Sequence, residues 1–202
     1  MTTFLLVRHG ETDAVGKLVA GWMPGWHLNR NGQKQAERLA RKLANRPIAA
    51  VYTSPLERTV ETAEPIAHAH GLTIRPIDDL GEVHAGDWEG KSFAELQHRD
   101  DWRRFNAHRG SARPPGGELM LEVQTRMVRQ IQSLAGGHPE HTVVVVTHGD
   151  PLRSLVAHYL GIPMDLISRF EISPGSLTTL QISPEDSCLL SLNDTDGMQV
   201  IS

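Results

Sequence analysis

The run Thr142-Val-Val-Val-Val-Thr147 is almost entirely β-branched and stops abruptly at His148-Gly149. β-Branched side chains favour a pleated, extended backbone, so the run predicts a strand. Phe4-Leu-Leu-Val7 is a shorter apolar run that stops at Arg8-His9-Gly10, and it predicts a second, buried strand. Both predicted strands therefore end at a histidine followed by a glycine.

Further strands and helices alternate along the chain. Residues 49–53 predict a third strand, and residues 177–182 and 189–192 are later candidates. Residues 33–43 carry apolar side chains at helical spacing. Ser54-Pro-Leu-Glu57 matches a capping box with proline at the first helical position, which predicts a helix that runs to about His70.

Three more helical patterns lie in the second half of the chain. Ser92-Phe-Ala-Glu95 is another possible capping box, and an apolar stripe between Leu119 and Leu134 predicts a long helix. Asp150-Pro151 predicts a helix start, with Asp150 as N-cap, and Gly161 its end. Strands that alternate with helices indicate an α/β fold with a largely parallel sheet.

Length and composition fit one ordinary domain. The chain has 202 residues, with no linker-like segment and no repeat, so we expect a single domain over residues 1–202. A net charge of -4 with scattered Lys and Arg argues against a nucleic-acid partner. The single cysteine, Cys188, excludes an internal disulfide framework. No signal peptide or membrane-length apolar run is present, so we expect a soluble, cytoplasmic protein with no membrane partner.

Cationic and imidazole side chains follow three of the predicted strands. Arg8 and His9 follow the first, Arg58 lies in the first helical turn after the strand at 49–53, and His148 follows Thr142–Thr147. Ligands of open α/β sheets bind beyond the carboxyl ends of the strands, and helix N-termini there favour anions. Guanidinium groups bind phosphate through forked hydrogen bonds, and an imidazole is a possible nucleophile. The pattern therefore indicates phosphoryl-transfer chemistry.

The chain resembles the histidine phosphatase superfamily, which includes the cofactor-dependent phosphoglycerate mutases. The resemblance rests on motifs that occur in the expected order over nearly the whole chain: Leu6-Val-Arg-His-Gly-Glu-Thr12, Gly32-x-x-Gln35-Ala36, Thr53-Ser-Pro-Leu-x-Arg58, Leu80-x-Glu82, Gly86-x-Trp88-Glu89-Gly90, Pro115-Gly-Gly-Glu118 and Val145-x-Thr147-His148-Gly149. It implies a three-layer α/β/α sandwich like that of phosphoglycerate mutase.

The resemblance also assigns roles to residues. It implies that His9 is the nucleophile that carries the phosphoryl group, and that Glu82 is the general acid and then the general base. Arg8, Arg58 and His148 complete the phosphate pocket, with Thr12 and the backbone of Gly149 as further phosphate contacts. It implies no cofactor and no metal, and the eleven histidines show no H-E-x-x-H spacing.

Three functions stay open at this point. A phosphomonoesterase is favoured because the stretch between Glu82 and His148 lacks the sizeable insertion of family mutases. A phosphoglycerate mutase-type phosphotransferase is the first alternative, with Arg103, Arg104, Arg109 and Arg113 as candidate cations for a second phosphate. The other is an inactive module that binds a phosphorylated ligand. In each case the partner is a small phosphorylated molecule, and we expect a monomer or a homodimer.

Several side chains have a structural interpretation beside the functional one. Many family members carry Asn near the position of Asp13, which would repel a phosphate, so we expect Asp13 to point away. Glu118 is expected to support the start of its helix, and Trp88 to lie in the core or at the substrate mouth. His68, His70, His138 and His141 are expected at the surface. The loops between residues 90 and 118 are expected to set specificity, but their sequence does not name the substrate.

Overall fold

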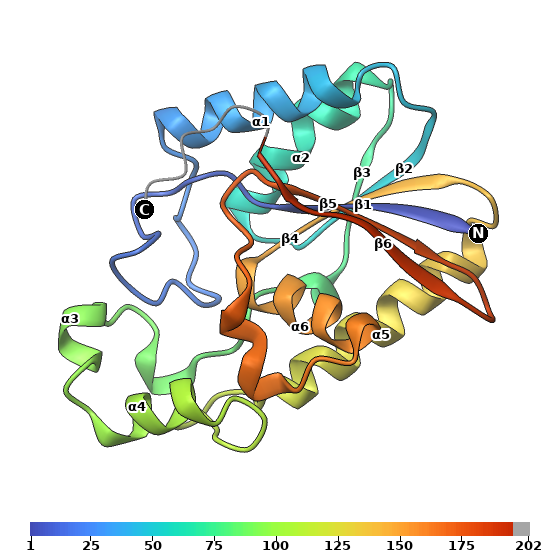
Figure 1. Cartoon of the computed structure of the whole chain (residues 1–202). Coiled ribbons are helices and arrows are strands. Elements are labelled where there is room, and N and C mark those ends of the chain that lie inside the picture. The colour runs from blue at the N-terminus through green and yellow to red at the C-terminus, as the bar shows by residue number, and fades with distance from the viewer. Residues whose placement is uncertain (196–202) are drawn as a thin grey trace.

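A computed structural model describes residues 1–195, and it consists of a six-stranded sheet with helices on both faces (Figure 1). The strands are β1 (Thr2–Arg8), β2 (Ile48–Thr53), β3 (Ile74–Pro76), β4 (Thr142–Thr147), β5 (Leu177–Ile182) and β6 (Ser187–Asp194). The main helices are α1 (Arg30–Leu43), α2 (Glu57–Ala69), α3 (Phe93–Leu96), α4 (Asp100–Ala107), α5 (Met120–Gly137) and α6 (Gly149–Leu160). Residues 196–202 of the predicted domain lie outside the described residues.

The sheet has the order β3-β2-β4-β1-β5-β6. Strands β3, β2, β4 and β1 pair in parallel, and β5 and β6 add antiparallel strands at one edge. The prediction of a largely parallel sheet in a three-layer α/β/α sandwich is therefore confirmed. β3 and α4 have no counterpart among the predicted elements.

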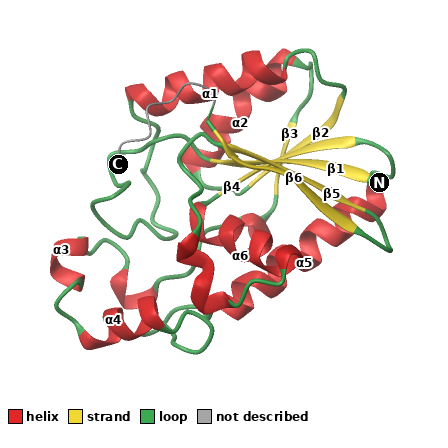
Figure 2. Cartoon of the chain, in the orientation of Figure 1, coloured by secondary structure: helices red, strands yellow, loops and turns green. Residues whose placement is uncertain are grey.

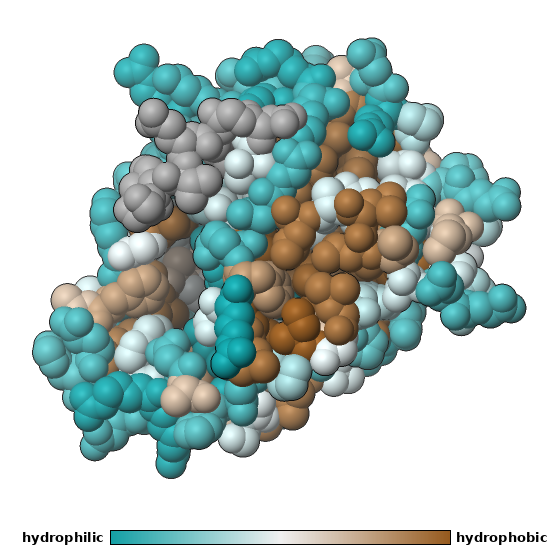
Figure 3. All heavy atoms as spheres, viewed as in Figure 1, coloured by the Kyte–Doolittle hydropathy of each residue, from teal (hydrophilic) through white to brown (hydrophobic). Residues whose placement is uncertain are grey.

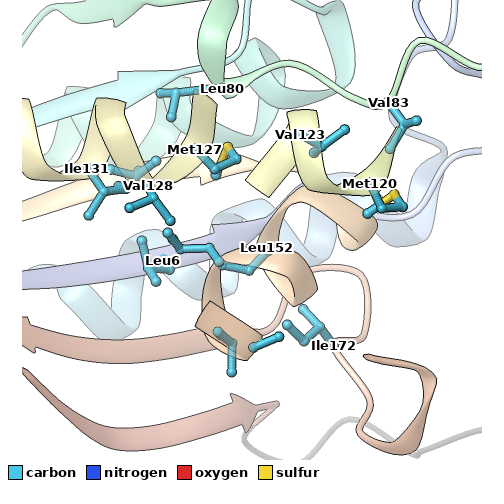
Figure 4. Close-up of a cluster of buried hydrophobic side chains, with 14 of the residues drawn as sticks. Leu6, Leu80, Val83, Met120, Val123, Met127, Val128, Ile131, Leu152 and Ile172 are labelled. Atoms are coloured by element: carbon cyan, nitrogen blue, oxygen red, sulfur yellow. The ribbon is translucent and has the colours of Figure 1, made fainter. Parts of the chain in front are cut away.

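Two apolar cores fill the spaces between the layers. Strand residues Leu5, Val7 and Val144 pack with Leu39 of α1 and Ile66 of α2 on one face. On the other face, alternate residues of the same strands pack against α5 and α6, as the cluster around Leu6, Met127 and Leu152 shows (Figure 4). Burial of both faces explains why β1 and β4 are apolar without alternation.

Helix ends explain where the elements start and stop. α1 begins after Asn29, whose side chain accepts hydrogen bonds from the backbone N–H groups of Asn31 and Gly32. The predicted capping box at Ser92 and Glu95 is confirmed at the start of α3. α6 ends at Gly161, which adopts a left-handed conformation with φ of 65°. The capping box and the terminal glycine were readable in the sequence because each lies within one turn of helix, whereas the Asn29 cap was not predicted.

Two predicted helix starts are wrong. α2 begins at Glu57 after Leu56, which makes no side-chain cap, so Ser54 is not its N-cap. α6 begins at Gly149, with His148 at the N-cap position, so Asp150 lies inside the first turn. In both places the polar side chain has a tertiary partner instead, Ser54 with His148 and Asp150 with Arg109. His70 and His138, expected at the surface, are half-buried, and His138 hydrogen-bonds the Tyr52 hydroxyl.

Helices α3 and α4 form a small lobe beside the carboxyl ends of the parallel strands, joined to the rest by long loops (Figure 2). The chain N-terminus lies at the opposite end of the sheet (Figure 1). Hydrophobic side chains also gather on the outer face near β5, β6 and α6 (Figure 3), where Leu190 and Leu160 are exposed. Among residues 1–195, no helix is long and apolar enough to cross a membrane.

Candidate active site

Three neighbouring parallel strands bring the predicted residues together. β2, β4 and β1 lie side by side, so their carboxyl ends meet at one edge of the sheet. His9 follows β1, His148 follows β4, and Arg58 lies in the first turn of α2 after β2. A cleft of about 560 Å³ opens at this edge, lined by these predicted residues among others: Arg8, His9, Thr12, Arg58, Glu82 and Gly149. His148 is fully buried, with its ring centroid 5.2 Å from that of His9.

The backbone orients the His9 ring. Its Nδ1 lies 2.7 Å from the carbonyl oxygen of Gly10, which can only accept, so Nδ1 carries the proton. Nε2 is then left with a free lone pair. Burial, with the positive charges of Arg58 and Arg8, lowers the pKa of His9 well below its usual range. The ring is therefore neutral near pH 7, as a nucleophile requires.

A buried hydroxyl orients the second histidine. Nε2 of His148 lies 2.8 Å from Oγ of Ser54, and the same oxygen lies 3.4 Å from the backbone N–H of Leu56. If the hydroxyl accepts from Leu56 and donates to Nε2, the proton of His148 sits on Nδ1. Burial and nearby Arg58 lower the pKa of this ring well below its usual range as well. Nδ1 is buried and has no partner among residues 1–195.

The guanidinium of Arg8 lies in the cleft, next to the backbone of Gly149. Its Nη1 donates to the carbonyl of Ile172 at 2.6 Å, which fixes one end of the guanidinium. A Cβ at Gly149 would lie 3.2 Å from Cζ and Nε of Arg8, so glycine gives the guanidinium room above the start of α6. Nε of Arg8 is buried, and no described residue accepts a hydrogen bond from it.

Arg58 is only 1% exposed although it is a cation in the first turn of a helix. The positive end of the helix dipole disfavours a cation there, so the position calls for an anionic partner. Its Nη2 donates to the carbonyl of Gly21 at 2.8 Å. Its Nη1 is buried without an acceptor in the described part of the chain.

Glu82 lies on a loop after β3 and lines the same cleft as His9. Its Oε2 lies 3.8 Å from Nδ1 of His148, and its Oε1 accepts a hydrogen bond from the Val83 N–H at 3.0 Å. The side chain is 21% exposed. Burial, and then the negative charge of Asp150, raises the pKa of this carboxyl, while Arg58 acts in the opposite direction. A carboxyl whose pKa is raised can hold a proton nearer neutral pH and pass it on.

Arg126 of α5 holds the segment that carries Glu82. Its Nη1 donates to the carbonyls of Asp79 and Gly81, at 2.7 and 2.9 Å, and its Nη2 donates to the carbonyl of Glu82 at 2.9 Å. Its Nε and Nη2 also donate to the two carboxylate oxygens of Glu118. All five guanidinium donors are therefore used. Glu118 was predicted to support a helix start, and its main partner is instead this arginine.

Trp22 also contacts the segment that carries Glu82. Its indole Nε1 donates to the carbonyl of Glu82 at 2.6 Å, and its ring stacks on His84 with centroids 4.5 Å apart. Sequence patterns give little sign of this clamp, formed by Trp22, Arg126 and Glu118, because most of its acceptors are backbone carbonyls. The Pro115-Gly-Gly-Glu118 motif was the only available signal.

Asp13 and Thr12 occupy opposite environments. Thr12 is 3% exposed and lines the cleft, whereas Asp13 is exposed and accepts a hydrogen bond from Asn29 at 3.4 Å. Asp13 is not among the residues that line the cleft, in agreement with the expectation that it points away.

Asp150 joins two arginines at the rim of the cleft. Its carboxylate accepts from Nη1 of Arg109 at 2.6 Å and from Nη1 of Arg153 at 3.2 Å. Burial alone would raise the pKa of Asp150, but the two guanidinium groups outweigh it and lower the pKa to about 2. Of the four arginines considered for a second phosphate, only Arg109 lines the cleft.

The floor of the cleft therefore carries the kind of donors that a tetrahedral anion would need. Arg8 Nε, Arg58 Nη1 and His148 Nδ1 are buried polar atoms without partners in residues 1–195. Such atoms are costly to leave unsatisfied, so they indicate a ligand that supplies acceptor oxygens. Beside them stand a neutral imidazole and a carboxyl with a raised pKa. Within the described residues, no His, Cys, Asp and Glu side chains form a metal-binding group of three or more.

Comparisons with known proteins agree over almost the whole chain. A family model described as "Histidine phosphatase superfamily (branch 1)" matches residues 4–195. Phosphoserine phosphatase 1 of Hydrogenobacter thermophilus is 30% identical over 199 residues, covering 96% of this chain and 93% of that protein. Adenosylcobalamin/alpha-ribazole phosphatase of Escherichia coli is 29% identical over 198 residues, covering 93% of this chain and 94% of that protein.

Comparison with solved structures shows a similar fold over almost the whole chain. The structure of Bacillus stearothermophilus YhfR matches with a TM-score of 0.90 at 32% identity, covering 96% of this chain and 98% of that one. The similarity therefore includes the backbone that carries the cleft.

Proposed function

The chain belongs to the histidine phosphatase superfamily, and from this membership we propose that it is a phosphomonoesterase that hydrolyses a small phosphorylated metabolite. The observation that carries the proposal is the neutral His9 ring, with its Nδ1 bonded to the Gly10 carbonyl, beside three buried donors that have no partner in residues 1–195. Relatives named as phosphatases support hydrolysis as the reaction type.

In the first step, Nε2 of His9 attacks phosphorus and the bond from phosphorus to the ester oxygen breaks. The leaving oxygen takes the proton of the Glu82 carboxyl, so the alcohol departs neutral. The phosphoryl group is then bonded to Nε2, and the positive charge on the ring is stabilised by the Nδ1–H bond to Gly10. The raised pKa of Glu82 supports this role because the group must hold a proton before the reaction.

In the second step, the ionised Glu82 takes a proton from water. The hydroxyl oxygen attacks phosphorus, the nitrogen–phosphorus bond breaks, and His9 regains its lone pair. Inorganic phosphate leaves, and Glu82 is protonated for the next cycle. Arg8, Arg58 and His148 donate to the phosphoryl oxygens in both steps, with Thr12 and the Gly149 N–H as further donors, which suits a reaction whose charge spreads over three oxygens.

The cations of the cleft favour hydrolysis over a mutase reaction. A mutase must hold a second phosphate, which needs unpaired cations beyond Arg8 and Arg58. Arg109 is bonded to Asp150 and Asn106, and Arg153 to Asp150 and Glu171. The set of catalytic groups also argues against an inactive binding module, because binding alone requires neither a nucleophile nor a proton donor.

The remaining parts of the proposal concern cofactors, domain extent, partners, oligomeric state and location. The two steps need no metal and no organic cofactor, since His9 supplies the nucleophile and three donors stabilise the charge. We propose one domain over residues 1–202, a small phosphomonoester as the partner, a monomer or homodimer, and a place in the cytoplasm, where phosphorylated metabolites occur.

Phosphate release tests the proposal. Purified protein is given a panel of phosphomonoesters in the presence of EDTA, alongside His9→Ala and the matched control His68→Ala, whose histidine is exposed on α2. We expect steady release that survives EDTA, persists in the control and is lost in His9→Ala. Release that needs a metal, or that persists in His9→Ala, would contradict the proposal. Isomerisation that depends on a bisphosphoglycerate, with phosphate retained on the substrate, would establish the mutase.

A further inference from the structure

The cleft extends well beyond the donors on its floor, and its outer part has a wall that the two chemical steps do not use. We propose that the preferred substrate is the phosphate monoester of an alcohol that carries a large apolar, ring-sized group and no second anionic group. This proposal rests on the proposed function and specifies the substrate class of the same site.

The wall is aromatic and comes from the lobe of α3 and α4. Phe93, Trp102 and Phe105 line the cleft together with Trp88, which precedes the lobe. Ring centroids of Trp88 lie 5.1 Å from Trp102 and 5.3 Å from Phe105, and Phe93 stacks on Trp102 at 5.8 Å. The rings therefore support one another as a rigid apolar surface.

Part of this surface is open to a ligand. Trp88 is 1% exposed and Phe105 5%, whereas Phe93 is 36% exposed, although it belongs to the same cluster. On the facing loop, Val15, Val19 and Ala20 extend the apolar lining. A flat, ring-shaped leaving group would bury most of its apolar surface between the aromatic wall and this loop, because aromatic side chains stack on flat apolar groups.

The rim that adjoins this wall at Phe105 is charged, but its cations and carboxylates are paired with each other. The Asp150 carboxylate accepts from both Arg109 and Arg153, and Glu171 accepts from Arg153 at 3.0 Å. Arg109 also lies over the Phe105 ring, with Cζ 4.4 Å from the centroid. The Nη atoms of both arginines are already hydrogen-bonded, so a carboxylate or second phosphate on the substrate would reach only their Nε atoms and would lie beside the Asp150 and Glu171 carboxylates. The rim therefore disfavours amino-acid and phosphoglycerate-type leaving groups.

The rim still has N–H donors that an uncharged group of the substrate could use. Arg109 and Arg153 line the cleft, and the Nε atom of each is buried and has no hydrogen-bond partner among the described residues. Each can donate to a neutral acceptor such as a hydroxyl, ether or ring nitrogen. The proposed leaving group therefore combines an apolar ring, seated against the aromatic wall, with at most uncharged acceptors on the side of Arg109.

A comparison of matched esters tests the proposal. 2-Phenylethyl phosphate, ethyl phosphate and phosphoserine all release a primary alcohol, so differences in leaving-group reactivity are small. We expect kcat/KM for 2-phenylethyl phosphate to exceed that for ethyl phosphate by about 10- to 100-fold, as burial of a phenyl group would give. Phosphoserine is expected to fall at or below ethyl phosphate.

Substitutions in the aromatic wall test whether the wall causes the preference for 2-phenylethyl phosphate. Phe93→Ala and Trp102→Ala are each expected to lower the ratio of kcat/KM between 2-phenylethyl and ethyl phosphate by about 3- to 10-fold. Leu121→Ala removes another exposed apolar side chain, on α5 outside the cleft, and is expected to leave the ratio unchanged. Because Phe93 is partly exposed, its variant tests the wall without disturbing the core.

The outcomes separate the two proposals. If ethyl phosphate or phosphoserine is hydrolysed as efficiently as 2-phenylethyl phosphate, the substrate class is wrong while the phosphomonoesterase stands. A ratio that both wall variants leave unchanged would also overturn it, because the preference would then arise elsewhere. If none of the three esters, nor any other phosphomonoester, is hydrolysed, the proposed function itself fails.

Discussion

At the scale of single residues, one hydroxyl determines what His148 can do. Ser54 Oγ occupies Nε2 of the ring, so Nδ1 faces the cleft and the Glu82 carboxylate. The sequence predicted Arg8, His9, Thr12, Arg58, Glu82 and Gly149 at one cleft, because each follows a strand or belongs to a family motif. It assigned Ser54 to a helix cap, since the contact that decides its role comes from a strand 94 positions away along the chain.

A prediction for Glu82 concerns the pH dependence of turnover. Its pKa is raised, so the proton donor is lost as pH rises through that pKa, which gives the alkaline limb of kcat/KM. The pKa of His9 is lowered, so the nucleophile is lost only as pH falls through that lower value. Glu82→Gln is expected to abolish the alkaline limb and lower kcat/KM about 10²- to 10⁴-fold for alkyl phosphates.

The measurement is a pH–rate profile of wild type, Glu82→Gln and the control Asp13→Asn. Asp13 is an exposed carboxylate outside the cleft, so its variant should keep both limbs. An alkaline limb that survives in Glu82→Gln at the same pH would assign the proton donor to another group.

At the scale of elements, the parallel strands bring the cationic and nucleophilic groups together, and α5 positions the acid. Neighbouring parallel strands necessarily end at one edge of the sheet, so the residues that follow β1, β2 and β4 could be placed together from the sequence. The clamp on residues 79–84 could not be predicted, because Arg126 binds carbonyls of Asp79, Gly81 and Glu82 that any sequence would provide. The lobe of α3 and α4 was likewise recognised only as a region of specificity, without its aromatic wall.

We expect Arg126→Lys to impair proton transfer more than nucleophilic attack. Lysine keeps the charge but cannot make the five directed hydrogen bonds of the guanidinium, so the Glu82 segment loses its fixed position. For 2-phenylethyl phosphate, kcat/KM should fall about 10- to 100-fold, the effect of one or two charged hydrogen bonds. For p-nitrophenyl phosphate, whose leaving group needs no proton, formation of the phosphoenzyme should fall much less.

Arg129→Lys is the matched control for this prediction. Arg129 lies on the same helix and pairs with Asp79, but its side chain is 73% exposed. Exposed ion pairs contribute little, so turnover should be unchanged. An equal loss for both substrates in Arg126→Lys would show that the arginine supports the fold in general and has no specific effect on Glu82.

At the scale of the whole molecule, two buried neutral histidines link stability to pH. His9 and His148 have lowered pKa values in the folded state, so below about pH 6.5 the unfolded chain binds protons that the folded chain does not. The free energy of unfolding should therefore decrease as pH falls from 7 to 5.5, by about 1 kcal/mol for each histidine.

Urea unfolding at pH 7 and 5.5 checks this linkage. His148→Asn should be less stable at pH 7 but show a smaller decrease on acidification, whereas His68→Asn, which changes an exposed histidine, should retain the wild-type difference. The same pH dependence in His148→Asn and wild type would contradict the claim that His148 is held neutral in the fold.

The central claim is that His9 carries the phosphoryl group, and trapping that group tests it most directly. In Glu82→Gln, p-nitrophenyl phosphate should still transfer its phosphoryl group while activation of water is slowed, so the phosphoenzyme accumulates. We expect mass spectrometry of peptides from an alkaline quench to place the phosphoryl group on His9, and Glu82→Gln/His9→Ala to remain unlabelled. A phosphoryl group on another residue, or turnover by wild type without any labelled His9 in the trap, would contradict the account.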